Sequence, residues 1–174
     1  MIEIVQGGRS ILVIAGHSSM KKNEMLSQAS VISEKLEGQI RLLDASKVFG
    51  LDHLKSAFQK ASRAFEENEN LSDSVVTETM LYMSGGRQIQ DAVKIIGIQE
   101  NTKFIVVITD IDGSHRNEIV KSLSLKEDDS IITDIQTKDI SQFGITDIEL
   151  TTVQEDKKLD LVLEKVASVD IRKK

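Results

Sequence analysis

One continuous apolar run, KFIVVIT at residues 103–109, constrains the fold more than any other part of this 174-residue sequence. It is rich in β-branched residues and has no polar position between its ends, a pattern typical of a strand at the centre of a sheet. Shorter segments of strand character occupy residues 2–6, 10–16 and 39–45. The chain must therefore build a sheet around residues 103–109, and the remaining elements must pack against it.

Helical periodicity dominates the middle of the chain. Apolar residues recur at three- and four-residue spacing between Leu51 and Phe65, which predicts an amphipathic helix. The same spacing predicts helices over the following ranges: 18–38, 76–83, 89–96, 114–123 and 159–166. We therefore expect an α+β fold, with a helical middle portion packed against a small mixed β-sheet in a single domain of residues 1–174.

Composition excludes several classes of protein. Hydrophobic residues make up 40% and charged residues 29%, which is typical of a soluble globular protein. There is no cysteine, so disulfides, thiolate metal sites and cysteine nucleophiles are excluded. No apolar run approaches the ~20 residues that a membrane span needs, and the N-terminus lacks the form of a signal peptide. We expect a cytoplasmic protein without a membrane partner.

The charge distribution argues against a general nucleic-acid binder. The net charge is -6, whereas binding to long duplexes needs a dense basic surface. Residues 41–63 nevertheless contain five basic and two acidic side chains. A local basic face of this kind suits a small, specific anionic target.

The sequence contains no recognisable catalytic or metal-binding set. Asp110 and Asp112 follow the central strand, but the calcium-loop pattern fails because Ser114 and Lys121 replace expected ligands. These acids equally fit a turn that leads into a helix. The three histidines lack zinc-site companions, and the phosphate-loop and nucleophile-elbow motifs are absent. We expect no catalytic residue, no metal and no cofactor.

A glycine doublet interrupts the helical region at Ser84-Gly85-Gly86-Arg87. Two glycines inside a helix would cost about 1 kcal/mol each, so the doublet indicates a break. Arg87 and Lys94, seven residues apart, would share one face of the helix that follows. The helix dipole disfavours a cation in the first turn of a helix. Arg87 at this position is more plausible if it binds an anion that also contacts the free backbone N–H groups of that turn. The alternative is a plain turn with Arg87 in solvent.

Two further groups of residues are candidates for binding. On the helix before the doublet, His53, Lys60 and Arg63 fall in one polar sector, which is either a second basic face or an ordinary solvated face. Leu81 lies off the apolar stripe of its helix, and Ile95 borders the polar side of the next. Exposed apolar residues there would suit a partner's groove, although the sheet could equally bury them.

Three stretches together carry a resemblance to a known family. They are LLDASKVFGLDHLKSAFQKASRAF, SVVTETMLYMSGGRQIQDAVKIIGI and, at the C-terminus, LVLEKVASVDIRKK. They resemble the PRPK-binding (TPRKB-like) subunit of the KEOPS, or EKC, complex over about half of the chain. The most specific part is the helix, then Ser84-Gly85-Gly86-Arg87-Gln88-Ile89, then a second apolar helix that ends at a glycine.

The resemblance implies a concrete role. KEOPS installs threonylcarbamoyladenosine in tRNA, and this subunit is not its catalyst. It binds the atypical kinase/ATPase subunit and the single-stranded 3′ CCA end of tRNA. The implied RNA-binding residues are Ser84, Gly85, Gly86, Arg87 and Gln88, supported by Lys94, Lys60, Arg63 and His53. The implied kinase-binding residues are Leu81, Tyr82 and Ile95.

Two other interpretations stay open at this point. One is a small phosphometabolite-binding α+β protein that uses the Ser84–Arg87 corner together with Asp110 and Asp112. The other is a structural adaptor without a ligand of its own. Residues 17–37 and 124–152 look longer than, or divergent from, the family pattern, and Met83 stands where a smaller residue is expected.

Overall fold

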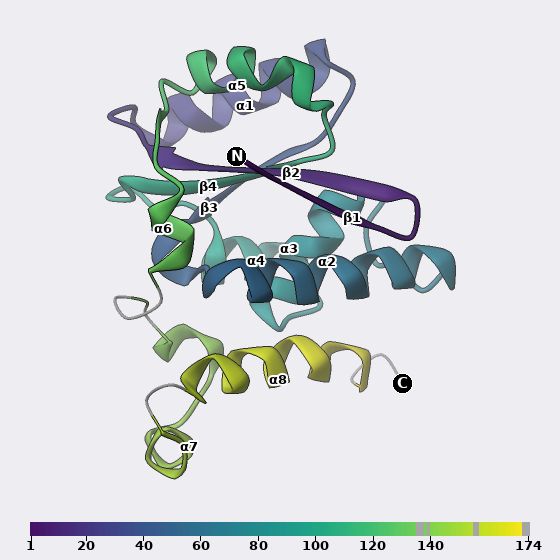
Figure 1. The fold of residues 1–174 in the computed structure, drawn as a ribbon, viewed down its shortest axis with the longest axis vertical. Coiled ribbons are helices and arrows are strands. Elements are labelled where there is room, and N and C mark those ends of the chain that lie inside the picture. The colour runs from purple at the N-terminus through teal and green to yellow at the C-terminus, as the bar shows by residue number, and fades with distance from the viewer. Residues whose placement is uncertain (135–137, 139, 155–156, 172–174) are drawn as a thin grey trace.

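A single sheet lies between two groups of helices in the computed structural model, which describes residues 1–134, 138, 140–154 and 157–171 (Figure 1). The strands of this described part are β1 (Ile2–Gln6), β2 (Arg9–His17), β3 (Ile40–Asp44), β4 (Phe104–Thr109) and β5 (Lys126–Glu127). They follow the order β1-β2-β4-β3, and β5 pairs with the end of β2. β4, which contains the apolar run, pairs on both sides and is central as predicted.

The α+β fold class is confirmed, but the expectation of a mixed sheet is wrong. Every strand pairing among the described residues is antiparallel. β1 and β2 form a hairpin through Gly7 and Gly8, whose φ angles of 56° and 73° are accessible to glycine at little cost. β2 and β3 both run opposite to β4, so no neighbouring strands within the described part of the sheet are parallel.

Helices cover both faces of the sheet (Figure 1). On one face lie α2 (Gly50–Glu66), α3 (Val75–Ser84) and α4 (Ile89–Ile96), and α8 (Lys158–Ile171) packs on α2 and α3. On the opposite face lie α1 (Lys22–Lys35) and α5 (Arg116–Ser122). The short helices are α6 (Ser130–Thr133) and α7 (Asp147–Thr152), and 3-10 turns occur at Ala45–Lys47, Gly113–His115 and Ser141–Phe143.

The sheet separates two hydrophobic cores because alternate side chains of each strand point to opposite faces. Val106 and Ile108 of β4 pack with α2, α3, α4 and α8, whereas Ile105 and Val107 pack with α1 and α5. The helical spacing predicted for α2 is confirmed, and its Phe58 is fully buried. No helix of the described chain is long and apolar enough to cross a membrane.

The helix break at the glycines is where the sequence predicts it, between α3 and α4. The helix expected over residues 114–123 begins instead with a 3-10 turn and becomes α-helical at Arg116. The final helix, α8, is longer than its apolar spacing indicates, and it lies across the outer side of α2 and α3. This placement of α8 brings C-terminal residues next to the glycine break.

Candidate functional site

The glycine break between α3 and α4 is first a helix-terminating turn. Gly85 adopts a left-handed conformation with φ 67°, which glycine tolerates best. Its N–H donates to the carbonyl of Tyr82 at 3.0 Å, and the N–H of Gly86 donates to the carbonyl of Leu81 at 3.2 Å. This pair of bonds is the Schellman motif, which satisfies the last carbonyls of a helix. The two glycine N–H groups are therefore used inside the turn.

Ser84 stabilises the same turn. Its hydroxyl donates to the carbonyl of Leu81 at 2.7 Å and accepts from the N–H of Gly86 at 3.1 Å. The side chain is buried, so Ser84 holds the backbone of the corner in place. Gln88 then occupies the N-cap position of α4 without a side-chain hydrogen bond to the first turn of that helix. First-turn N–H groups have no acceptor within their own helix, so they are the backbone donors that this corner can offer a ligand.

Cationic side chains surround a hollow beside the turn. The hollow has a volume of about 650 Å³. It is lined by the following residues: Ser84, Gly85, Gly86, Arg87, Gln88, Asp91, Lys94, Ile95, Phe143, Gly144 and Lys165. We call it the corner hollow. Arg87 is exposed, and the Lys94 side chain is 76% exposed with its Nζ 3.5 Å from Asp91. An exposed pair of this kind contributes little to stability, so Lys94 remains able to attract an anion.

Lys165 is a residue of this hollow that the sequence analysis missed. It comes from α8, and its backbone passes so close that a Cβ atom on Gly85 would lie 3.2 Å from the Lys165 Cβ. The Lys165 Nζ lies 3.6 Å from Oε1 of Glu149. The sequence placed Lys165 on the last helix but gave no sign that this helix docks on the glycine turn. A third cation therefore joins Arg87 and Lys94.

The expectation that His53 belongs to a polar surface is wrong. Its side chain is fully buried between α2 and α3. Nδ1 accepts a hydrogen bond from the N–H of Phe49 at 3.1 Å, and Nε2 lies 2.9 Å from the carbonyl of Met83. The proton is therefore on Nε2, and burial lowers the pKa of His53 to about 4 although the Met83 bond opposes this change. A neutral, buried imidazole positions the end of α3 and does not reach an external ligand.

Lys60 and Arg63 lie in a different hollow from the glycine turn. It has a volume of about 430 Å³ and is also lined by Glu67, Tyr82 and Asp170. Lys60 Nζ donates to Oδ2 of Asp170 at 2.7 Å, and Arg63 Nε donates to Oε1 of Glu67 at 2.8 Å. The structure thus brings Lys94 and Lys165 to the corner but does not bring Lys60 and Arg63 there.

Leu81 and Tyr82 are buried, so of the two alternatives left open for Leu81 the structure shows burial, and no exposed side chain supports the kinase-binding role that the resemblance implies for these two residues. Each is 1% exposed, because α3 is enclosed by α2, α4, α8 and β3. The Tyr82 hydroxyl donates to Oδ1 of Asp170 at 2.5 Å, and burial together with this bond raises the tyrosine pKa. Ile95 is half-buried against the same core.

The exposed apolar residues of this region are instead Ile89 and Val93, which are 44% and 43% exposed. Together with Ala92 and Ile96 they form the apolar stripe from whose spacing the helix over residues 89–96 is predicted. Only Ala92 and Ile96 of that stripe are buried, because α4 meets the rest of the protein along a narrow face. Ile89 and Val93 give α4 an apolar surface of its own.

The acids after the central strand accept hydrogen bonds from backbone N–H groups. Oδ1 of Asp110 accepts from the N–H of Gln39 at 2.6 Å, and Oδ1 of Asp112 accepts from the N–H of Ser114 at 2.8 Å. Asp112 is the capping residue of the 3-10 turn. Within the described ranges, no group of three histidine or acidic side chains is arranged to hold a metal ion. No observation here favours the phosphometabolite interpretation.

Comparison with known proteins gives a family match over most of the chain. Residues 18–169 match the family model described as "Kinase binding protein CGI-121". A protein of Coccidioides immitis named "EKC/KEOPS complex subunit CGI121" is 31% identical over 88 residues, which are 48% of this chain and 42% of that protein. A protein of the same name from Kluyveromyces lactis is 30% identical over 95 residues, which are 55% of this chain and 60% of that protein. The alignments thus span about half the length of these relatives.

Proposed function

The chain belongs to the CGI-121 family of kinase-binding proteins, and from this premise we propose that it is a non-catalytic subunit of an EKC/KEOPS complex. In this role it binds the atypical kinase/ATPase subunit and supports threonylcarbamoyladenosine modification of tRNA. The observation that carries the proposal is the family match, which extends over α1 to α8 and includes the whole helical layer around the glycine turn.

Exposed apolar residues on α4 support a kinase-binding role. Ile89 projects into solvent at 44% exposure from a helix whose other side is fixed against α3. Burying the part of this side chain that is still exposed would stabilise a complex by about 1 kcal/mol. We therefore assign Ile89 to the kinase-docking surface, in place of the buried Leu81 and Tyr82.

The test is a binding measurement with the purified kinase subunit by isothermal titration calorimetry. Ile89→Asp should weaken binding at least about tenfold, because a charge would enter an apolar contact. Ile148→Asp is the matched control, since Ile148 is 77% exposed on α7, away from α4. Equal affinities for the two variants would remove Ile89 from the interface, and no binding by the wild-type chain would overturn the kinase-binding role.

The corner hollow supports binding of the tRNA 3′ end. A short single strand needs only a few phosphate contacts and base-edge hydrogen bonds, and the hollow offers Arg87, Lys94 and Lys165 with the amide of Gln88. The fixed turn holds these groups on elements that are packed into the core. Aromatic platforms are scarce there, because Tyr82 is buried and Phe143, which lines the hollow, is only 7% exposed, so stacking would use the Arg87 guanidinium.

Fluorescence anisotropy with labelled tRNA tests this site. Intact tRNA should bind more tightly than tRNA without its CCA end, and Arg87→Ala should weaken only the binding of intact tRNA. Loss of one phosphate contact should also lower the slope of log affinity against log salt by about 0.7. Lys94→Ala should behave likewise, whereas Lys121→Ala on α5, at the opposite face of the sheet, should not. Equal binding of intact and trimmed tRNA would refute the site.

A further inference from the structure

Asp91 is the one acidic side chain, among the described residues, that lines the corner hollow. The other charged side chains of its lining are the cations Arg87, Lys94 and Lys165. A carboxylate repels phosphate groups, so it lowers the affinity of such a hollow for an anion. An acid at this position therefore either has a structural role in α4 or contacts a part of the ligand that carries a hydrogen-bond donor.

The contacts of Asp91 within the protein are weak. Asp91 is in the first turn of α4, where the helix dipole favours an acidic side chain. The described residues give its carboxylate one partner, Lys94, whose Nζ lies 3.5 Å from Oδ1. The two side chains are 51% and 76% exposed, so this ion pair contributes little to stability. The carboxylate can therefore accept a hydrogen bond from a ligand.

One face of α4 turns polar groups of different kinds towards the corner hollow. Gln88, Asp91 and Lys94 are spaced three residues apart, which makes them successive neighbours on the helix surface, and all three line the hollow. Ile95, which is half-buried, adds apolar surface to the same face. The amide of Gln88 donates and accepts, the carboxylate only accepts, and the ammonium only donates. This order suits a ligand with both a base edge and phosphates.

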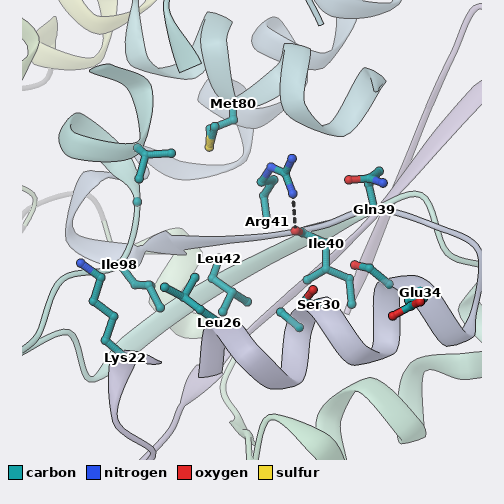
Figure 2. Close-up of a pocket in the computed structure, with 14 residues that line it drawn as sticks. Lys22, Leu26, Ser30, Glu34, Gln39, Ile40, Arg41, Leu42, Met80 and Ile98 are labelled. Atoms are coloured by element: carbon teal, nitrogen blue, oxygen red, sulfur yellow. Dashed lines mark hydrogen bonds between the residues drawn. The ribbon is translucent and has the colours of Figure 1, made fainter. Parts of the chain in front are cut away.

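The other exposed side of α4 faces a separate hollow of about 480 Å³ that follows β3 (Figure 2). Val93 lines this second hollow together with Met80 and Arg41. The guanidinium of Arg41 donates from Nη1 to the carbonyl of Ile40 at 3.0 Å. Asp91 does not line the second hollow, so its carboxylate belongs to the corner side of α4.

Cytosine and uracil differ in the group that a carboxylate can contact. Cytosine presents its N4 amino donor beside the N3 acceptor, whereas uracil presents its O4 acceptor beside the N3–H donor. Asp and Glu side chains recognise cytosine by accepting a hydrogen bond from N4. The side-chain amide of Gln88 can donate to N3 of the same base. An acid beside an amide therefore favours cytosine over uracil.

We infer that Asp91 determines base specificity at the corner hollow, by accepting a hydrogen bond from the N4 amino group of a cytosine in the single-stranded 3′ end of tRNA. Gln88 contacts the same base, and Arg87, Lys94 and Lys165 bind the neighbouring phosphates. Both cytosines of the CCA end carry this amino group. The inference rests on the proposed binding of the tRNA end at this hollow, and it adds which base group is recognised and by which residue.

Fluorescence anisotropy with three labelled tRNAs, ending in CCA, UCA and CUA, tests the inference. With the wild-type protein, at least one of the two uridine substitutions should weaken binding at least about fivefold, because a good base-edge contact discriminates by this factor or more. With Asp91→Asn the preference should fall to near one, because an amide can accept from N4 and can also turn to donate to O4. The uridine-containing end that wild type rejects should therefore bind more tightly to the variant than to wild type.

Glu149→Gln is the matched control. It removes one negative charge beside Lys165 but leaves the lining of the hollow unchanged. Glutamine can replace glutamate in the capping box with Thr146, so α7 should keep its first turn. This variant should bind all three tRNAs more tightly by the same factor, and circular dichroism should show that both variants are folded.

Two results would overturn the inference and leave the tRNA site in place. One is equal binding of the three tRNAs by wild type, and the other is a wild-type preference that persists in Asp91→Asn, in each case with weaker binding of tRNA that lacks its CCA end. Loss of the preference in Glu149→Gln would also overturn it, because charge alone would then explain the discrimination. Equal binding of intact and trimmed tRNA would refute the site together with the inference.

Discussion

One buried residue, His53, should contribute a separable part of the destabilisation of this protein by acid. In the folded chain burial lowers the pKa of His53 from 6.5 to about 4. The unfolded chain therefore binds the proton first as the pH falls. The stability that neutral His53 contributes is fully present above pH 6.5 and is lost as the pH falls towards 4. Below pH 4 both states are protonated, and the loss is complete.

The magnitude follows from the same two pKa values. They differ by about 2.5 pH units, and each unit corresponds to about 1.4 kcal/mol, so the full loss is about 3–4 kcal/mol. This is a large part of the 5–15 kcal/mol that is typical for a domain. The cause is structural, because a proton on Nδ1 would replace the acceptor that the N–H of Phe49 uses, inside an apolar site formed with Phe143.

Urea unfolding of wild type and His53→Gln between pH 7 and pH 4 measures this effect. The glutamine does not titrate, so the carboxylates contribute equally to both proteins and cancel in the difference. Wild type should lose about 3 kcal/mol more than the variant over this range. Parallel pH profiles would refute the reasoning, as would an NMR titration that gives His53 a pKa near 6.5.

Three further predictions concern the same region. Gly85→Ala should lower the free energy of unfolding by at least about 1 kcal/mol, because φ is 67°, whereas Gly113→Ala, with open space around it, should be near neutral in the same urea titration. Tyr82→Phe should cost about 1–3 kcal/mol in thermal unfolding, through loss of the bond to Asp170. Phe58→Ala should cost about 3–5 kcal/mol, measured by urea unfolding, because its ring is fully buried.

The sequence predicts this fold well where one element has one buried face. The central strand β4 and the break at Gly85-Gly86 follow from local chemistry, and both are confirmed. The sequence predicts burial less well where a helix or strand is covered from several sides. α2 contacts α3, α8, β1 and α6, so its buried surface extends beyond the apolar stripe and includes His53. α3 is enclosed almost completely, and a periodicity argument cannot show that Leu81 is inside.

Only the part of the candidate site that is formed by residues adjacent in the sequence could be predicted. The order Ser84-Gly85-Gly86-Arg87 identified the corner, because the turn depends on residues that are adjacent in the sequence. The third cation, Lys165, depends on how α8 docks, and no local pattern contains that information. For the same reason Lys60 and Arg63, although they are on a neighbouring helix, line another hollow.

The short helix α4 connects the proposed sites. Successive residues are about 100° apart around a helix, so Val93 and Lys94 point in clearly different directions. Lys94 lines the corner hollow, Val93 is exposed together with Ile89 four residues earlier, and Ala92 is buried. A tRNA end at the corner and the kinase subunit at Ile89 would therefore contact separate faces of one helix. We expect both to bind at the same time, and competition between tRNA and the kinase subunit in the anisotropy assay would show instead that α4 must move to admit either one.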